Sequence, residues 1–303
     1  MLQELQSGLK WLIWYLNLIP DMLRLIQFIK ARPEIAAIWY QIQDLFRKKT
    51  LGRSFDQLSP YWQERIHKVC AAEINQQIAR HKDAGRIING YQVMHNGLKI
   101  RIGSYYGYGE SFDATHLMLE MNKGVHEPEE EFYFHEVLKQ IPDGAVMIEL
   151  GAYWSYYSMW FNSTIRGAQN YMIEPDARSL YSGKKNFSLN GLKGKFFQYF
   201  IASASTAETI PSTISVDDFI EKQGLSKVHV LHCDIQGYEL QMLMGAASSL
   251  RKKLFDHIFI STHSAELHFD CIKLLTEAGY HIHKEIDLDK ISSFDGLIVA
   301  SSN

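Results

Sequence analysis

Short apolar runs bounded by polar or turn-forming residues recur through the second half of the chain. They predict seven strands, with helical patterns between most of them, at residues 145–150, 169–173, 195–201, 228–234, 255–262, 279–286 and 295–300. Strands that alternate with helices form a mostly parallel sheet with helices on both faces. No helical pattern separates the last two runs, so we expect that pair to be antiparallel. The pattern predicts an α/β fold with a doubly wound, seven-stranded sheet.

The first part of the chain has a different pattern. Residues 1–48 predict helices rich in apolar and aromatic side chains, and a further helix is predicted at about 60–81. Asn17 and Pro20 interrupt the apolar run, which therefore falls short of the roughly 20 residues that span a bilayer. No small-residue cleavage site follows, which argues against a signal peptide. Basic residues among the apolar ones would allow these helices to lie on a membrane surface. The favoured alternative is that their apolar faces pack on the rest of the chain or on a second subunit.

Asn96-Gly97 lies between two short alternating runs, which predicts a β-hairpin at 91–102. The next stretch, 103–109, is rich in glycine and tyrosine and fits either a lid that contacts a sugar or a plain surface loop. We therefore expect three parts, namely a helical cap or association region at 1–88, the hairpin and loop at 89–125, and the α/β domain at 126–303.

Composition narrows the functional classes. The 303 residues are 46% hydrophobic and carry a formal net charge of −3, so the chain folds into a full core and shows no basic character that favours nucleic acid. Its three cysteines are widely spaced, without a C-x-x-C pair, and indicate neither a disulfide framework nor a zinc site. A reducing cytoplasm is the expected location, with membrane association through the N-terminal helices as the alternative.

Acidic residues stand at, or directly after, the carboxyl ends of three of the predicted strands. Glu149 precedes Gly151, Glu174 precedes Pro175, and Asp234 ends the fourth run. Ligands of open α/β sheets bind outside the carboxyl ends of the strands, so these acids point to one crevice. Glycine at 151 permits close approach of backbone to a ligand, and an acid about twenty residues later is well placed for a ribose diol. A dehydrogenase is disfavoured because no G-x-G-x-x-G follows the first strand.

The ordered motifs MIELGAYWSYYS, YMIEPDARSLYSGKKNFSLNGL, VHVLHCDIQGYELQMLMGA and HIFISTHS resemble the FkbM family of S-adenosylmethionine-dependent methyltransferases over about residues 125–300. The resemblance implies a Class I methyltransferase fold and methylation of a hydroxyl oxygen on a sugar or natural product. It also implies a cofactor site made of Glu149, Gly151, Ala152, Tyr153, Ser155, Glu174, Pro175, Ala202, Asp234 and Glu127. Glu127 and Glu130 lie at a predicted helix start beside Pro128, where helix capping alone explains acids. The resemblance implies in addition that this Glu-Pro-Glu stretch borders the cofactor pocket, which makes both residues candidates for it.

The sequence departs from the family pattern at three positions. Tyr153 and Ser155 replace the Asn and the second Gly of the usual Gly-Ala-Asn-x-Gly, and their bulk is expected to reshape the methionine end of the pocket. Gln236 stands where the family has Glu, which removes a negative charge beside Asp234.

Methyl transfer to oxygen requires an aligned acceptor and a group that removes its proton. Asp234 is the first candidate, and His263, which follows the strand ending at Thr262, is a second candidate base or a structural histidine. Glu239 is expected to form a pocket wall or cap a helix. A magnesium ion held by these three side chains is the minority alternative, and no metal ligands are assigned.

Three functional classes follow. The leading hypothesis is an O-methyltransferase acting on a small molecule or glycan. A scaffold or binding protein that kept the fold without the chemistry is the second, motivated by Tyr153, Ser155 and Gln236. A methyltransferase acting on nucleic acid or protein is the third, disfavoured by the acidic balance.

Overall fold

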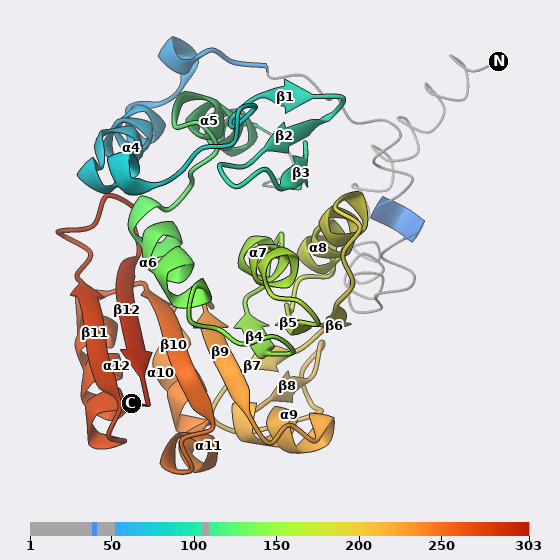
Figure 1. The fold of residues 1–303 in the computed structure, drawn as a ribbon, viewed down its shortest axis with the longest axis vertical. Helices are drawn as coiled ribbons and strands as arrows, with labels where there is room; N and C mark the ends of the chain where they lie inside the picture. Colours follow the sequence, from blue (N-terminus) through green and yellow to red (C-terminus); the bar gives the residue numbers. More distant parts are fainter. Residues whose placement is uncertain (1–37, 41–51, 105–108, 303) are drawn as a thin grey trace.

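The computed structural model describes residues 38–40, 52–104 and 109–302 (Figure 1). A seven-stranded sheet with the strand order β11-β12-β10-β9-β4-β5-β6 forms its centre. Its strands are β4 (Val146–Leu150), β5 (Gln169–Ile173), β6 (Lys195–Phe197), β9 (Val228–Cys233), β10 (Phe255–Thr262), β11 (His281–Ile286) and β12 (Gly296–Ser301). Strand β12 runs antiparallel to both of its neighbours, and the other pairings are parallel. The predicted α/β class, the seven strands and the antiparallel final pair are confirmed.

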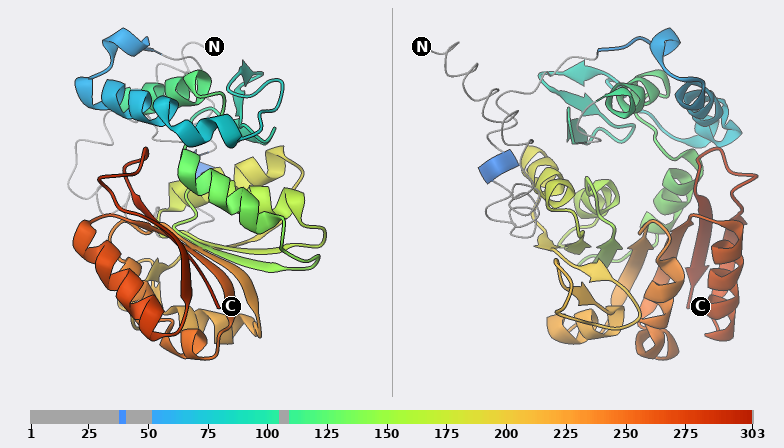
Figure 2. Two further views of the ribbon diagram at one scale, coloured as in Figure 1. Left: turned by 60° about the vertical axis from the view of Figure 1, so that its left-hand side comes forward. Right: turned by 180° about the vertical axis from the view of Figure 1, so that it is seen from behind.

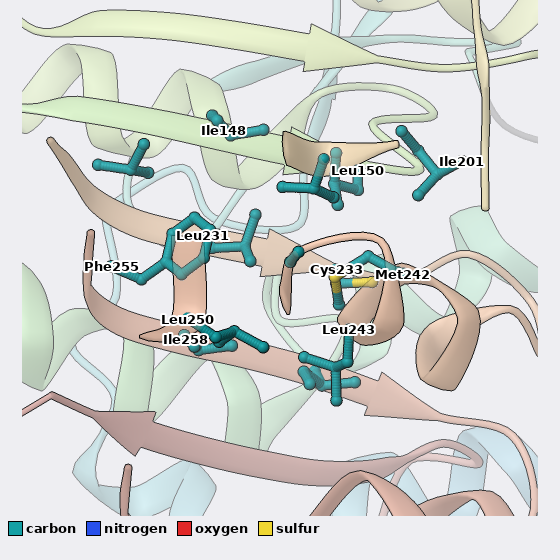
Figure 3. Packing of buried hydrophobic residues seen from close by; sticks show 14 of the residues in the cluster. Ile148, Leu150, Ile201, Leu231, Cys233, Met242, Leu243, Leu250, Phe255 and Ile258 are labelled. Atoms are coloured by element: carbon teal, nitrogen blue, oxygen red, sulfur yellow. The ribbon is translucent and has the colours of Figure 1, made fainter. Parts of the chain in front are cut away.

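Helices cover both faces of this sheet (Figure 2). One layer contains α6 (Pro128–Leu138), α7 (Tyr156–Thr164) and α8 (Ala177–Leu189), and the other contains α9 (Val216–Gln223), α10 (Glu239–Met244), α11 (Ala247–Arg251) and α12 (Ala265–Glu277). Side chains alternate along β4, so that Met147 joins the first layer while Ile148 and Leu150 join the second. Figure 3 shows the second layer, where Leu231 and Cys233 of β9 pack with Met242 and Leu243 of α10.

A smaller unit lies above the carboxyl ends of the strands (Figure 1). It contains the 3₁₀ turns η1 (Phe55–Gln57) and η2 (Glu73–Gln77), the helices α4 (Pro60–Ala71) and α5 (Glu110–Met121), and the strands β1 (Ile87–Ile88), β2 (Tyr91–Val93) and β3 (Lys99–Arg101). The predicted hairpin is confirmed by the antiparallel pairing of β2 with β3. Strand β1 extends it to a three-stranded sheet that the sequence pattern did not predict.

The helix predicted at 60–81 ends early, at Ala71. The backbone of Ala72 leaves the helical conformation, with a ψ of 121°, and the side-chain amide of Asn75 donates to the carbonyl oxygen of Val69 at 2.7 Å. This amide satisfies a terminal carbonyl of α4 and competes with continuation of the helix. Helix α5 was not predicted, since only a hairpin and a loop were assigned to residues 89–125.

The strand predicted at 195–201 is two strands. β6 ends where β5 ends, because Ile173 pairs with Phe197 and the following residues Glu174 and Pro175 leave the sheet. The chain then turns away, and β7 (Phe200–Ile201) pairs in parallel with β8 (Thr213–Ile214) in a separate sheet. The apolar run across 195–201 concealed this break.

Asn186 of α8 and Asn190, which directly follows this helix, hold the hairpin against the main domain. The side chain of Asn190 accepts a hydrogen bond from the Lys99 amide at 2.9 Å and donates to the Lys99 carbonyl at 2.8 Å. Asn186 similarly accepts from the Arg101 amide at 3.0 Å and donates to the Trp154 carbonyl at 3.1 Å. These bonds satisfy the outer edge of β3, which has β2 on its other side only.

We expect Asn190→Ala to lower the free energy of unfolding by about 2 kcal/mol, because it leaves the edge groups of Lys99 without these partners. Chemical denaturation monitored by circular dichroism measures the change. Ser188→Ala, at an exposed position of the same helix, is the control and is expected to change stability by less than about 0.5 kcal/mol. Equal effects in the two variants would contradict the proposed anchoring.

Most of the predicted N-terminal helices at 1–48, and the Tyr105 to Tyr108 loop, lie outside the described residues. Within 38–40, Tyr40 is buried against Ala177 and Tyr181 of α8. Across the described residues, no helix combines the length and the hydropathy needed to cross a bilayer.

Candidate active site

A cavity of about 980 Å³ lies at the carboxyl ends of β4, β5 and β9, beneath α4 and α5. It contains nine of the ten residues expected to bind a cofactor, namely Glu127, Glu149, Gly151, Ala152, Tyr153, Glu174, Pro175, Ala202 and Asp234. The acids from three strand ends do meet in one crevice, as the pattern of the sequence predicts. A cavity of this size is at the upper end of those that bind small molecules and cofactors.

The loop after β4 is fixed between two neighbouring strands. The amides of Gly151 and Ala152 both donate to the carbonyl of Ile173, at 2.9 and 3.0 Å, and Asp234 donates to Leu150 at 3.0 Å. Gly151 has a φ of +73°, and a Cβ atom there would lie 1.7 Å from the carbonyl oxygen of Asp234. The close approach of β9 therefore requires glycine at this position.

The two unusual residues of this loop face different ways. Tyr153 and Ser155 both have left-handed backbone, with φ of 44° and 63°. Tyr153 lines the cavity, but Ser155 does not. The Ser155 hydroxyl points to Gly183 of α8, where an added Cβ would lie 2.3 Å from its Oγ atom. Because residue 183 is a glycine, the Ser155 side chain fits against α8 and away from the cavity. Of the two unusual residues, Tyr153 is therefore the one that lines the cavity wall.

Glu174 and Glu149 are buried carboxyl groups in the cavity wall. Glu174 accepts hydrogen bonds from the backbone amides of Tyr153 at 2.9 Å and Asp176 at 2.8 Å, so its carboxyl group is held in place at the end of β5. Burial raises the pKa of Glu174 and of Glu149 to about 7. The Oε2 atom of Glu149 is buried without a hydrogen-bond partner among the described residues. A cationic or hydroxylated ligand would supply one.

The three candidate catalytic residues converge. His263 lies between two carboxylates, with Nδ1 2.9 Å from Glu239 Oε1 and Nε2 3.3 Å from Asp234 Oδ1. Asp295, from the loop before β12, is 3.5 Å from the same Nε2. Asp234 and Asp295 line the cavity, whereas Glu239 and His263 stand behind them. Burial opposes the charge of His263, yet the Asp234 and Glu239 carboxylates, which accept hydrogen bonds from the imidazole, outweigh it and raise the pKa of His263 to about 10.

Gln236 supports Asp234 directly. Its backbone is left-handed, with a φ of 56°, and its amide Nε2 donates to Asp234 Oδ1 at 2.9 Å. A glutamate at position 236 would place a second negative charge beside Asp234, whereas the Gln236 amide donates a hydrogen bond to it. The protonated His263 and Gln236 thus both face Oδ1, which leaves Oδ2 of Asp234 for a ligand.

The start of α6 does more than cap a helix. Glu127 lines the cavity and accepts a hydrogen bond from the Tyr157 hydroxyl at 2.9 Å. Glu130 lies deeper, where it contacts His232 of β9 at 2.6 Å and accepts from Ser261 of β10 at 2.8 Å. Burial raises the pKa of Glu130. Glu130 therefore braces strands beneath the cavity and does not line it.

Other lining residues carry no sequence signal. Tyr61, Trp62 and Arg65 come from α4, and Phe294 comes from the loop before β12. Arg65 lies over the ring of Phe294 at 4.5 Å, and the ring centres of Phe294 and Tyr61 are 5.5 Å apart. The smaller N-terminal unit and the C-terminal loop thus meet over the cavity in an aromatic wall.

The fold and site are those of a Class I S-adenosylmethionine-dependent methyltransferase. They combine a doubly wound sheet of this strand order with a glycine turn after β4 and with acids at the ends of the neighbouring strands. The chain belongs to the FkbM methyltransferase family, whose domain profile, the Methyltransferase FkbM domain, matches residues 127–282. Its cofactor is accordingly S-adenosylmethionine. A search of curated proteins found no match.

Similar solved structures include the precorrin-6y C5,15-methyltransferase from Geobacter metallireducens GS-15, at 13% identity and a TM-score of 0.42, over 59% of this chain and 90% of that one. The METTL16 methyltransferase domain has 13% identity and a TM-score of 0.46, and the match covers 79% of this chain and 92% of that one. M. capricolum TrmK in complex with S-adenosylhomocysteine has 14% identity and a TM-score of 0.39, and the match covers 57% of this chain and 68% of that one. At these identities the likeness concerns the fold alone.

Proposed function

We propose that this methyltransferase acts on a hydroxyl oxygen of a sugar, glycan or other hydroxylated small molecule. The observation that carries the proposal is the Asp234 carboxylate at the cavity wall, held by His263 and Gln236 on one oxygen. A neutral hydroxyl is a weak nucleophile that loses its proton as the methyl group is transferred, and a carboxylate held in this way can accept that proton. The aromatic wall of Tyr61, Trp62 and Phe294 suits a ring-shaped acceptor.

The cavity fits the cofactor on its own chemistry. Five carboxyl groups line it, from Glu127, Glu149, Glu174, Asp234 and Asp295. They suit the ammonium, the sulfonium and the ribose hydroxyls, and we propose that Glu174 holds the ribose and that the loop at Gly151 meets the amino-acid end. When bound, S-adenosylmethionine supplies a methyl group already activated by its sulfonium.

The remaining chemistry is movement of one proton. His263 holds its own proton at neutral pH, so we propose that Asp234 takes the proton of the acceptor hydroxyl and that His263 and Glu239 position Asp234. A protonated imidazole beside the carboxylate attracts it and fixes its orientation. Asp295, whose pKa burial raises to about 6, faces the same Nε2 atom of His263 as Asp234 does.

We expect Glu174→Ala to weaken binding of S-adenosylhomocysteine by about 10- to 100-fold, because a buried carboxylate hydrogen bond to the ligand is lost. Isothermal titration calorimetry measures it, with Glu221→Ala on the exposed face of α9 as the control. Methyl transfer is then assayed over a set of sugars and hydroxylated metabolites. Failure of the well-folded wild type to bind would reject the proposal in favour of a scaffold role.

The alternative in which magnesium assists the reaction has a direct test. Asp234, Glu239 and His263 offer ligand atoms within 4.8 Å of one another, but both imidazole nitrogens already face carboxylates. We therefore expect turnover to change by less than about twofold after dialysis against EDTA, since a proton-loaded histidine is no metal ligand. Loss of turnover that added magnesium restores would establish the metal-assisted alternative.

A further inference from the structure

The charges around the cavity are unbalanced. Among the described residues that line it, Arg65 is the only lysine or arginine, against five carboxyl groups. His126 also lines the cavity, but its Nδ1 atom lies 3.3 Å from Glu127 Oε2, so that any charge it carries is already paired. Arg65 has no such carboxylate, since it makes no hydrogen bond or ion pair to a described residue, and its Nε atom is buried without a partner.

The guanidinium of Arg65 is nevertheless held firmly. It lies over the rings of Phe294, at 4.5 Å, and Trp62, at 5.4 Å. Two aromatic faces fix the plane of the group and leave its N–H groups to bind something else. An arginine that is positioned by packing and has free donors is preorganised to bind a planar oxyanion with two hydrogen bonds.

The position of Arg65 indicates which part of the cavity it serves. Its charge acts on His126 and Glu127 at the start of α6 and on Asp295 beside Phe294, where it opposes protonation of the imidazole and favours the ionised carboxylates. The His126 ring packs edge-on against Trp154, with ring centres 5.2 Å apart, and Trp154 belongs to the loop that follows Gly151. Arg65 thus lies at the Gly151 loop, the end assigned to the amino-acid part of the cofactor, and not at Glu174.

We infer that Arg65 binds the carboxylate of the amino-acid end of S-adenosylmethionine. The cofactor has one anionic group, and Arg65 is the one lysine or arginine among the described residues of the cavity wall. This inference rests on the proposed function of the cavity. It makes α4, which lies outside the matched family domain at 127–282, part of the cofactor site. Because α4 and the Phe294 loop both hold Arg65, the cofactor links the smaller unit to the C-terminal loop.

The test compares two ligands by calorimetry. S-adenosylhomocysteine carries the amino-acid carboxylate, whereas 5′-methylthioadenosine retains the nucleoside and lacks that end. We expect Arg65→Gln to weaken binding of S-adenosylhomocysteine by about 10- to 100-fold and binding of 5′-methylthioadenosine by less than about twofold. Arg65→Lys, which keeps a point charge without the planar fork, is expected to fall between wild type and Arg65→Gln.

Lys68→Gln is the matched control. Lys68 lies three residues further along α4, and its Nζ atom is 5.7 Å from the Phe294 ring, but it does not line the cavity and pairs with Glu64 at 2.9 Å. Its removal is expected to leave both affinities unchanged. Thermal unfolding of each variant confirms that the chain is folded, and if Arg65→Gln unfolds, Arg65→Lys decides the result.

Two outcomes would overturn the inference while the proposed function stands. An equal loss of affinity for both ligands assigns Arg65 a purely structural role, and an unchanged affinity for S-adenosylhomocysteine with a raised KM for the acceptor assigns Arg65 to an acidic acceptor. If folded wild-type protein binds neither ligand, the proposed function itself fails.

Discussion

Asp234→Asn is expected to reduce kcat by about 10²- to 10⁴-fold, the range of a lost general base. Asparagine keeps the shape of the side chain and an oxygen for the donors of His263 and Gln236, but it does not accept a proton from a hydroxyl. The affinity for S-adenosylhomocysteine is expected to change by less than about threefold, because the carboxyl groups of Glu149 and Glu174 remain. Steady-state kinetics with the best acceptor and calorimetry with the product measure the two effects.

Asp295→Asn is the comparison for this prediction. Asp295 lines the same cavity and faces the same His263 Nε2 atom, at 3.5 Å. Its amide variant is expected to lose less than about tenfold in kcat, because Gln236 and Glu239 still hold Asp234 and His263 in place. Similar losses in both variants would show that the negative charge around His263 matters and that no single carboxylate is the base.

The acids at strand ends could be predicted from the sequence because one rule places them. Glu149, Glu174 and Asp234 each lie at or next to the carboxyl end of a buried run, and the carboxyl ends of parallel strands meet at one edge of a sheet. The site therefore follows from three local patterns once the strands are assigned. The split of β6 from β7 could not be predicted in this way, because it depends on where β5 ends in space.

Residues brought in by the packing of distant segments could not be predicted. Glu130 contacts a histidine 102 residues away and a serine 131 residues away, and no local pattern encodes either distance. Arg65 has the spacing of an ordinary half-exposed helix residue, and only the approach of Phe294 places it in the cavity wall. From the sequence we expected the bulk of Ser155 to reshape the cofactor pocket. The structure places its side chain against Gly183, which lies on another helix and could not be linked to Ser155 from the local pattern.

Gly151→Ala is expected to lower the free energy of unfolding by more than about 4 kcal/mol, enough to unfold many domains of this kind. The added methyl group would lie 1.7 Å from the carbonyl oxygen of Asp234, which is backbone and held in the sheet through its own amide bond to Leu150. Relief requires β4 and β9 to separate, which disturbs the buried layers on both faces. Urea denaturation of the variant, without ligand, measures the loss.

Gly191→Ala separates this clash from backbone strain. Gly191 has a φ of +69°, close to the +73° of Gly151, but a Cβ atom there meets nothing within 4 Å. Its cost is expected to be about 1 to 2 kcal/mol, that of a left-handed alanine alone. Comparable losses in the two variants would mean that the left-handed backbone conformation, and not the close approach of the Asp234 carbonyl, requires glycine at 151. A much larger loss at Gly151 would show that the glycine turn is required by the sheet itself, before any cofactor binds.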